Sequence, residues 1–334
     1  MGGLPNTLPD HRAIEPSEEA QGVWIDGTPH LITAELKVWS ATSKVESTRI
    51  PGYWFSKRGT DPGPKTPVQP REKVFLYFHG GGYVLQSAHP QALTSNIPRS
   101  LLELTDAVPR ALAVEYRLSS THPLPDRYPF PAALLDALAG YNYLVNVVGY
   151  DPSNVIMVGD SAGANIALAL TRYLVEYKGT TDVPLPSPPS DLLLISPWVD
   201  ASDSHDGPGS SNVTNYGDII EDLTEEKGFP VYAKRAFLGP YGSEMAATNP
   251  YISPASLHPL AKASFTGFPR TFIQAGGAER LLDSIRTLRD KMVADMGEDE
   301  VTYYEAPDGV HDCLIFPSDP VNPPILKAIQ QWIA

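Results

Sequence analysis

The chain has 334 residues, of which 42% are apolar and 19% charged, a balance typical of a globular protein with a large core. Its formal net charge of −14 argues against nucleic acid and anionic membrane surfaces as partners. No run approaches the ~20 apolar residues that a membrane-spanning helix needs. The single cysteine, Cys313, excludes an internal disulfide and has no metal-site spacing.

The first 44 residues give expectations about location and organisation. Residues 1–5 lack the basic and apolar regions of a signal peptide, so we expect a cytoplasmic protein that does not bind membranes. Apolar residues such as Trp24, Leu36 and Trp39, spread among polar ones, suggest a helical arm that packs on the rest of the chain. Oligomeric state is not readable from this pattern, and a homodimer stays open.

Short apolar runs alternate with helical patterns from residue 73 onwards. Before this point, residues 45–56 resemble two short strands around Pro51-Gly52, and residues 59–67 indicate a surface loop rich in proline and glycine. The expected strands are 74–78, 111–116, 155–158, 192–195, 271–275 and 301–304. The expected helices are 93–104, 131–148, one that runs through residue 166 to about residue 177, 281–296 and 324–332. This alternation predicts an α/β fold with a mainly parallel sheet and helices on both faces.

Residues 200–255 break the alternation with turn residues, a short acidic stretch (221–226) and amphipathic pieces near 231–237. We interpret them as an insertion over the carboxyl-terminal edge of the sheet, where α/β sheets bind ligands. The predicted organisation is an N-terminal arm (1–44) that forms part of a cap, a core (45–199), a cap insertion (200–255) and the continued core (256–334).

Residues 159–163 read Gly-Asp-Ser-Ala-Gly between a predicted strand and a predicted helix. The G-x-S-x-G pattern is typical of a nucleophile elbow, which presents a serine at the tip of a strained turn. Glycines at 159 and 163 would leave room where the strand and helix cross. The helix N-terminus would direct free N–H groups toward negative charge beside Ser161. A loop serine at a helix start would give the same pattern.

A second glycine-rich segment, His79-Gly80-Gly81-Gly82, follows the strand predicted at 74–78. Glycines let backbone N–H groups approach a ligand closely, so this segment is suited to supply the donors of an oxyanion hole. A glycine-rich bend is the alternative, whereas a phosphate-binding P-loop would need a Gly-Lys-Ser/Thr ending that the sequence lacks. We expect His79 to fix the loop by hydrogen bonds and not to act as a base.

A serine nucleophile needs a histidine base, and three histidines follow Ser161. His311 lies in the loop just after the last predicted strand, where the chain order Ser, Asp/Glu, His requires the base. His205 and His258 lie in irregular segments, and we expect them on the surface or in the cap. The sequence therefore favours His311.

The acid that orients the histidine should lie where the strand 271–275 ends. Glu279 is at that turn, and Asp283 is one helical turn further on, where the helix dipole alone would favour an acid. This reasoning does not decide between Glu279 and Asp283 as the acid. Asp160 is a third carboxylate, but a neighbour of Ser161 in the elbow cannot readily orient a distant imidazole.

Aromatic residues in the predicted pocket-forming segments suggest an apolar acyl or alcohol site, although they would equally serve as core. These residues are Tyr83, Tyr216, Phe229, Tyr232 and Phe237. Tyr83 follows the glycine segment directly, and Asp160 precedes the serine. We expect these two side chains to contact the substrate.

Five segments together resemble the hormone-sensitive-lipase-like branch of the α/β-hydrolases, over roughly residues 70–334. They are residues 74–83, Val114-Glu115-Tyr116-Arg117-Leu118, His122-Pro123-Leu124-Pro125, residues 159–165 and Ser196-Pro197-Trp198-Val199-Asp200. The resemblance implies the α/β-hydrolase fold with a cap built from the N-terminal arm and an insertion.

The resemblance also implies roles for individual residues. The acid motif of that family is Asp-x-Leu-x-Asp, and the matching residues 279–283 read Glu-Arg-Leu-Leu-Asp, so the catalytic acid falls on Glu279, with Asp283 as second choice. The chain departs from the family here, since it carries Glu where Asp is usual. The implied oxyanion hole consists of the amides of Gly81, Gly82 and Ala162.

The expected function is a carboxylic-ester hydrolase, a serine carboxylesterase or deacetylase that acts on small to medium acyl esters. Its expected partner is a small-molecule ester, with no cofactor, no metal and no nucleic acid. Amides or lactones are alternative substrates of the same machinery. A non-catalytic small-molecule receptor is the alternative class, because plant gibberellin receptors resemble this family but lack the histidine that His311 supplies here.

Overall fold

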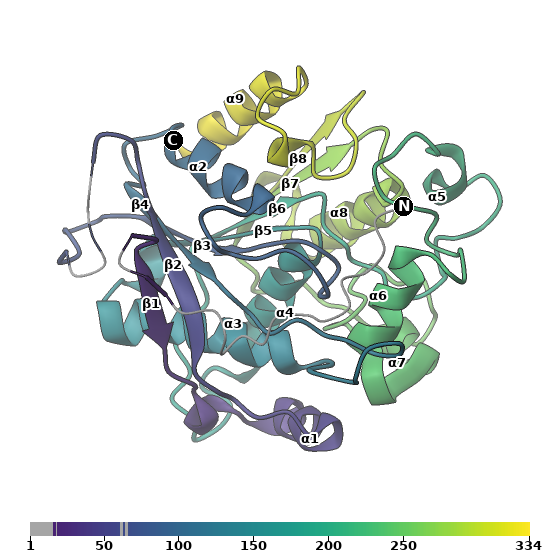
Figure 1. Cartoon of the computed structure of the whole chain (residues 1–334), viewed down its shortest axis with the longest axis horizontal. Coiled ribbons are helices and arrows are strands. Elements are labelled where there is room, and N and C mark those ends of the chain that lie inside the picture. Colours follow the sequence, from purple (N-terminus) through teal and green to yellow (C-terminus); the bar gives the residue numbers. More distant parts are fainter. Residues whose placement is uncertain (1–15, 18, 61–62, 64–65) are drawn as a thin grey trace.

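A single mixed sheet organises residues 16–17, 19–60, 63 and 66–334, which the computed structural model describes. Its eight strands follow the order β1-β2-β4-β3-β5-β6-β7-β8 (Figure 1). The strands are β1 (Gly22–Ile25), β2 (Ile50–Ser56), β3 (Val74–Phe78), β4 (Arg110–Val114), β5 (Val155–Asp160), β6 (Asp191–Ile195), β7 (Arg270–Gly276) and β8 (Val301–Ala306). β2 is antiparallel to both β1 and β4, and the pairs from β4 to β8 are parallel, which confirms the predicted α/β sheet.

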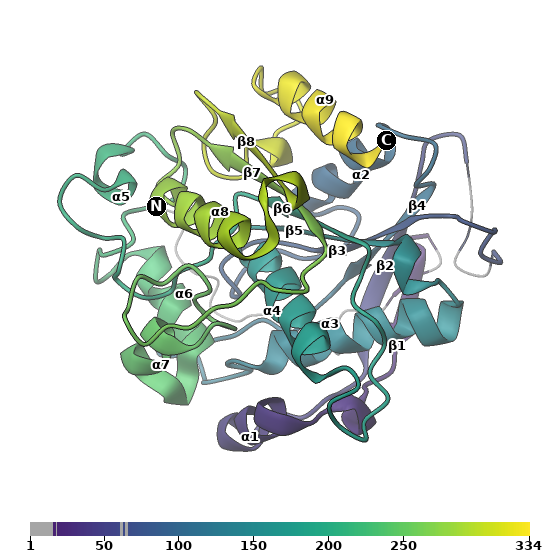
Figure 2. The same cartoon turned by 180° about the vertical axis from the view of Figure 1, so that it is seen from behind.

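Helices cover both faces of the sheet. They are α1 (Ala34–Ser43), α2 (Asn96–Leu102), α3 (Ala132–Asn142), α4 (Ala162–Tyr177), α5 (Ser211–Thr214), α6 (Phe229–Leu238), α7 (Gly242–Thr248), α8 (Leu282–Met296) and α9 (Asn322–Ile333). Alternate strand residues point to opposite faces, so the apolar core is divided in two. One part lies under α2 and α9, and the other under α3, α4 and α8, the face seen in Figure 2. None of the described helices has the length and apolar character that crossing a bilayer requires.

The strand register brings the carboxyl ends of the central strands together. Phe78 at the end of β3 is level with Gly159 of β5, and Asp160 is level with Ile195 at the end of β6. Gly276 of β7 is likewise level with Ala306 of β8. The loops that follow these strands therefore lie along one edge of the sheet, where parallel α/β sheets form their sites.

The N-terminal segments differ from the sequence prediction. Residues 22–25 form the edge strand β1, so the predicted helical arm is helical only in its later part, α1, and residues 1–15 lie outside the described residues. Residues 50–56 form one strand through Pro51 and Gly52, not two short strands. Pairing overrides the turn signal here, because Pro51 is the second residue of the strand and its carbonyl still accepts the N–H of Glu115.

Two other expectations need adjustment. The helix predicted over 131–148 ends as α3 at Asn142 and continues as a π-helical turn, Tyr143–Val148. The predicted loop 59–67 falls partly on residues 61–62 and 64–65, which lie outside the described residues.

The segment 200–255 forms α5, α6 and α7 beside the carboxyl edge of the sheet (Figure 1). Helix α1 of the arm contacts this segment, since Trp39 packs edge-on against Tyr251 and its carbonyl accepts the hydroxyl of Tyr241 at 3.0 Å. The arm and the insertion thus touch each other. Their division into cap and core stays a prediction.

A buried ion pair fixes the chain where it leaves β4. The guanidinium of Arg117 donates to both carboxylate oxygens of Asp136 on α3, at 2.7 Å and 2.9 Å, and the Arg117 amide donates to the same carboxylate at 2.8 Å. The two side chains are only 3% and 1% exposed. Neither charge can therefore be hydrated if its partner is removed.

We expect Asp136→Ala to lower the free energy of unfolding by about 3–5 kcal/mol, because it leaves the Arg117 charge buried and unpaired. Denaturant unfolding followed by circular dichroism measures this. The control is Asp106→Ala, which removes an exposed carboxylate paired with Lys57 and should leave stability unchanged. Equal stability of the two variants would contradict the structural role assigned to the buried pair.

Candidate active site

Ser161 occupies a strained turn between β5 and α4, as predicted. Its backbone angles are φ 50° and ψ −117°, which a non-glycine residue rarely adopts. Two hydrogen bonds hold this conformation: the Ser161 amide donates to the Ile195 carbonyl at 2.9 Å, and the Ser161 carbonyl accepts the Trp198 amide at 3.0 Å. The side chain consequently lines a cavity at the carboxyl edge of the sheet.

The glycines beside Ser161 are required by close backbone approach. A Cβ on Gly163 would lie 2.0 Å from the carbonyl oxygen of Phe78, and one on Gly159 would lie 2.3 Å from the carbonyl of Gly163. The neighbouring atoms are backbone atoms that cannot move aside easily. The glycine spacing in the sequence therefore reflects how tightly the strand and the helix cross.

The structure brings Ser161, His311 and Glu279 together in one hydrogen-bonded line. His311 Nε2 lies 3.0 Å from Ser161 Oγ, and His311 Nδ1 lies 2.8 Å from Glu279 Oε2. Glu279 follows β7, His311 follows β8, and both are buried. The other oxygen of Glu279 accepts the Gly276 amide at 2.6 Å, which fixes the carboxylate toward the ring.

Asp283, the second choice for the acid, lies elsewhere. Its Oδ2 accepts the Ser211 amide at 2.7 Å, and Ser211 Oγ accepts the Asp283 amide at 3.0 Å. This reciprocal pair ties α5 of the insertion to the start of α8. Of the two candidate acids, only Glu279 contacts the imidazole.

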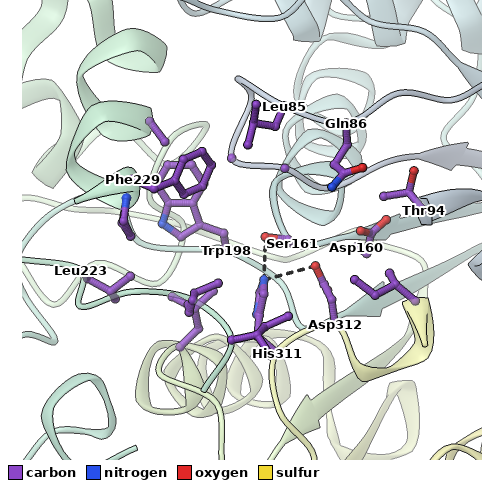
Figure 3. A pocket seen from close by; sticks show the side chains of 18 residues that line it. Leu85, Gln86, Thr94, Asp160, Ser161, Trp198, Leu223, Phe229, His311 and Asp312 are labelled. Atoms are coloured by element: carbon purple, nitrogen blue, oxygen red, sulfur yellow. Dashed lines mark hydrogen bonds and ion pairs between the residues drawn. The ribbon is translucent and has the colours of Figure 1, made fainter. Parts of the chain in front are cut away.

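Sequence reasoning missed two acidic residues that contact His311. Asp312 Oδ2 lies 3.2 Å from His311 Nε2, the nitrogen that also faces Ser161 (Figure 3). Asp218 of the insertion accepts the backbone amides of both His311 and Arg280 at 2.8 Å. Asp312 follows the predicted base directly, so adjacency was an available signal, whereas nothing local to Asp218 indicates its contact.

Electrostatics around the ring favour its protonated form. Burial lowers the pKa of His311, but the carboxylates of Asp312 and Glu279 raise it, and the resulting pKa lies well above the ordinary value. Burial also raises the pKa of Glu279. The neutral imidazole that can accept a proton from Ser161 therefore forms only as the pH rises through the raised pKa of His311.

Three backbone amides lie free beside Ser161. Gly81 and Gly82 have φ values of 104° and 59°, and both line the cavity, while Ala162 is the first residue of α4. Among the residues that the structure describes, the amides of Gly81, Gly82 and Ala162 donate to no protein acceptor. The first amide of a helix has no partner within the helix, so these donors are available to a ligand.

His79 and Asp160 fix the glycine loop by hydrogen bonds to the backbone of Gly80. His79 Nδ1 lies 2.7 Å from the Gly80 carbonyl, and its ring stacks on Tyr116 with centroids 4.2 Å apart. Burial lowers the pKa of His79 to about 4, so the ring is neutral and suited to the structural role expected of it. The Asp160 carboxylate accepts the Tyr77 hydroxyl at 2.5 Å and the Gly80 amide at 2.9 Å.

The two residues expected to contact the substrate, Asp160 and Tyr83, differ in how they lie relative to the cavity. Asp160 belongs to the cavity wall, but its carboxylate is fully buried and engaged by Tyr77 and Gly80, so it supports the loop. Tyr83 does not line the cavity. Its ring stacks on Phe237 with centroids 3.8 Å apart, and its hydroxyl donates to Asn165 at 2.6 Å.

The cavity beside Ser161 has a volume of about 180 Å³ and largely apolar walls. Its lining from the insertion consists of Ile219, Ile220, Leu223, Phe229, Pro230 and Ala233. Among the five aromatic residues predicted near the pocket, Phe229 is the one in this lining (Figure 3). Tyr232 and Phe237 are buried, and Tyr216 is 84% exposed on the surface.

Comparison with known proteins gives consistent matches. A family model described as alpha/beta hydrolase fold matches residues 75–315. An acetyl-hydrolase of Streptomyces hygroscopicus is 33% identical over 250 residues, which cover 73% of this chain and 69% of that protein. Esterase LipU of Mycobacterium tuberculosis is 26% identical over 79% of this chain and 77% of its own length.

Solved structures agree with these matches. The crystal structure of an esterase from the bacterial hormone-sensitive lipase family superposes with a TM-score of 0.62 at 27% identity. The superposition covers 85% of this chain and 80% of that one. A metagenomic hormone-sensitive lipase gives a TM-score of 0.63 at 25% identity with the same coverage.

We expect Gly163→Ala to lower the free energy of unfolding by about 1–3 kcal/mol, because its Cβ would overlap the backbone of Phe78. Denaturant midpoints measure the loss. Gly207→Ala is the matched control, since a Cβ at Gly207 meets no atom within 4 Å. A Gly163→Ala protein as stable as the control would contradict the tight crossing.

Proposed function

Because this chain belongs to the α/β-hydrolase family, in its hormone-sensitive-lipase-like branch of carboxylic-ester hydrolases, we propose that it cleaves small to medium acyl esters through a serine acyl-enzyme. The observation that carries the proposal is the line of hydrogen bonds from Ser161 through His311 to Glu279, at 3.0 Å and 2.8 Å. This geometry matches the roles of nucleophile, base and orienting acid.

In the first half of the reaction, Ser161 Oγ attacks the ester carbonyl while its proton passes to His311 Nε2. Glu279 accepts the hydrogen bond of Nδ1–H, which orients the ring and stabilises the imidazolium that forms. The proton then moves from Nε2 to the leaving alcohol as the C–O bond breaks. The product of this half is an acyl group bound to Ser161.

The negative charge on the carbonyl oxygen is assigned to the amides of Gly81, Gly82 and Ala162. They are unpartnered among the described residues, and the first two line the cavity. Fixed donors of this kind are commonly worth ~2.7–4 kcal/mol each when one is removed. The Asp160 carboxylate accepts hydrogen bonds from the Tyr77 hydroxyl and from the Gly80 amide, which keeps the loop in place and limits its reorganisation.

In the second half, water attacks the acyl-enzyme. His311 accepts a proton from the water and returns it to Ser161 Oγ as the tetrahedral intermediate collapses, which releases the carboxylic acid and restores the Ser161 hydroxyl. Asp160 and Tyr83 have supporting positions in this scheme and are not assigned to substrate contact.

The acyl group is assigned to the cavity of about 180 Å³ beside Ser161, whose walls come partly from residues 219–233. On this proposal the insertion 200–255 is the main part of the cap, and the arm 1–44 supports it through the contact of Trp39 with Tyr251. The remaining residues, 45–199 and 256–334, form the catalytic core. A cytoplasmic location stays a prediction, and a homodimer stays open.

We expect Ser161→Ala to abolish hydrolysis of p-nitrophenyl esters, and Glu279→Ala to lower kcat by about 10³–10⁴-fold. Asp283→Asn should retain turnover within about tenfold, because Asp283 contacts Ser211 and not the ring. Steady-state rates of the purified variants, with circular dichroism to verify folding, measure these effects. A larger loss in Asp283→Asn than in Glu279→Ala would reverse the acid assignment.

The same assay separates the alternatives. Anilides and lactones of equal acyl length test whether the machinery prefers amides or lactones. A folded wild-type protein without turnover on any of these substrates would favour a narrow natural substrate or the receptor alternative.

We expect Phe229→Ala to raise kcat/KM for longer p-nitrophenyl acyl chains, relative to the acetate, by about tenfold, because it enlarges the apolar cavity. Tyr216→Ala is the matched control, since Tyr216 is an aromatic residue of the same insertion that lies exposed outside the cavity. An unchanged chain-length profile in Phe229→Ala would place the acyl group elsewhere.

A further inference from the structure

The imidazole of His311 lies between two carboxylates, one at each ring nitrogen. Glu279 Oε2 is 2.8 Å from Nδ1, and Asp312 Oδ2 is 3.2 Å from Nε2. We propose that Asp312 is a positioning residue that competes with Ser161 for the Nε2 proton and so sets the pH range in which His311 acts as a base. The inference rests on the proposed ester-hydrolase function and adds a fourth residue to it.

The backbone of Asp312 directs this carboxylate toward the ring. The residue adopts a left-handed conformation, with φ 51° and ψ 35°, which non-glycine residues seldom adopt and Asp and Asn tolerate best. The Ser196 hydroxyl accepts its amide hydrogen at 3.1 Å and holds the turn. The Asp312 side chain therefore turns toward the imidazole of the adjacent His311 and not toward the protein surface.

The carboxylate is placed where its charge is poorly screened. Asp312 is 6% exposed, and its Oδ1 is buried without a hydrogen-bond partner among the described residues. Both Asp312 and His311 line the cavity beside Ser161 (Figure 3). A carboxylate in this position interacts with the imidazolium more strongly than one in water would.

The contact has opposite effects in the two protonation states of the ring. Neutral His311, with its proton on Nδ1 and toward Glu279, offers the Nε2 lone pair to the Ser161 hydroxyl. A carboxylate 3.2 Å from that lone pair repels it. Once Nε2 is protonated, the same carboxylate can accept its hydrogen bond. Asp312 therefore stabilises the imidazolium, both at rest in acid and transiently during the proposed reaction.

Other acidic groups face the same ring and must be considered. Glu279 approaches from the β7–α8 loop, Asp160 lies beneath Ser161 at the end of β5, and Asp218 of the insertion accepts the His311 amide. Of these, only Glu279 contacts a ring nitrogen, and that is Nδ1. Burial and the Asp312 charge both raise the pKa of Asp160.

The proton balance is simple. The Ser161 proton moves to Nε2 when the serine attacks, and it leaves with the alcohol. Asp312 gains and loses no proton in the cycle and only accepts a hydrogen bond while Nε2 is protonated. Removing the Asp312 charge should therefore let Nε2 lose its proton at lower pH. It should also destabilise the imidazolium that forms during turnover.

The test compares pH profiles of kcat/KM for p-nitrophenyl acetate in wild type, Asp312→Asn and Asp312→Gly. Both substitutions remove the charge, and both residues tolerate a positive φ. We expect the acid limb to move to lower pH and the alkaline plateau to fall in both variants. The ratio of kcat/KM in the variant to kcat/KM in wild type should be about tenfold higher on the acid limb than on the plateau.

The control is Glu305→Gln, which removes a carboxylate of β8 that pairs with Arg286 away from the cavity. Its profile should coincide with that of wild type. In the two Asp312 variants, kcat/KM could instead be lowered by the same factor at all pH values. That result would overturn the proposal and leave Asp312 with a purely structural role.

A second measurement does not depend on ester turnover. The rate at which a fluorophosphonate labels Ser161 reports the basicity of His311, and its pH dependence should shift in the Asp312 variants in the same direction. If the wild-type protein labels but hydrolyses no ester, the proposed function fails while this inference is still tested. If labelling has the same pH dependence in all four proteins, the inference fails.

Discussion

At the turn between β5 and α4, the backbone of Gly163 passes so close to the Phe78 carbonyl that a methyl group has no room. This approach sets the angle between strand and helix and leaves Ser161 in a strained conformation with a positive φ. It also places the end of β3 beside the first turn of α4. The glycine loop after β3 and the free amide of Ala162 are thereby brought to the same side chain, so one backbone contact positions the nucleophile and the three amides assigned to the oxyanion.

The remaining site residues depend on the parallel register, which brings the carboxyl ends of β5, β6, β7 and β8 to one edge of the sheet. Glu279 and His311 come from separate loops, and Asp218 of the insertion joins them by accepting one amide from each loop, those of Arg280 and His311. The insertion therefore does more than wall the cavity. Since it is hydrogen-bonded to both loops, a movement of the insertion would change the position of the ring as well as the size of the cavity.

Sequence reasoning was most reliable where the chemistry is encoded by neighbouring residues. Ser161 and the glycines at 81 and 82 are of this kind, and so is the alternation of strands and helices. The local sequence did not distinguish Glu279 from Asp283, because only the folded chain decides which of the two side chains contacts His311. The stacking of Tyr83 on Phe237 and the contact of Asp312 with His311 could not be predicted, because side-chain direction follows from ring stacking and a left-handed turn. Strand β1 replaces part of the expected helical arm and β2 runs through an expected turn, because strand pairing overrides both local signals.

Negatively charged groups outnumber positive ones in the site, since several carboxylates lie around the single imidazole of His311. Asp160 accepts hydrogen bonds from Tyr77 and Gly80, and Asp218 accepts the amides of His311 and Arg280, so neither carboxylate is directed at a ring nitrogen. Glu279 and Asp312 are different, because each directs an oxygen to a ring nitrogen. In an apolar cavity such charges act strongly on His311. They stabilise the imidazolium that serine attack creates, and the same interaction opposes the neutral base that the attack requires. The strength of the proposed base is therefore a balance fixed by where these two loops hold their carboxylates.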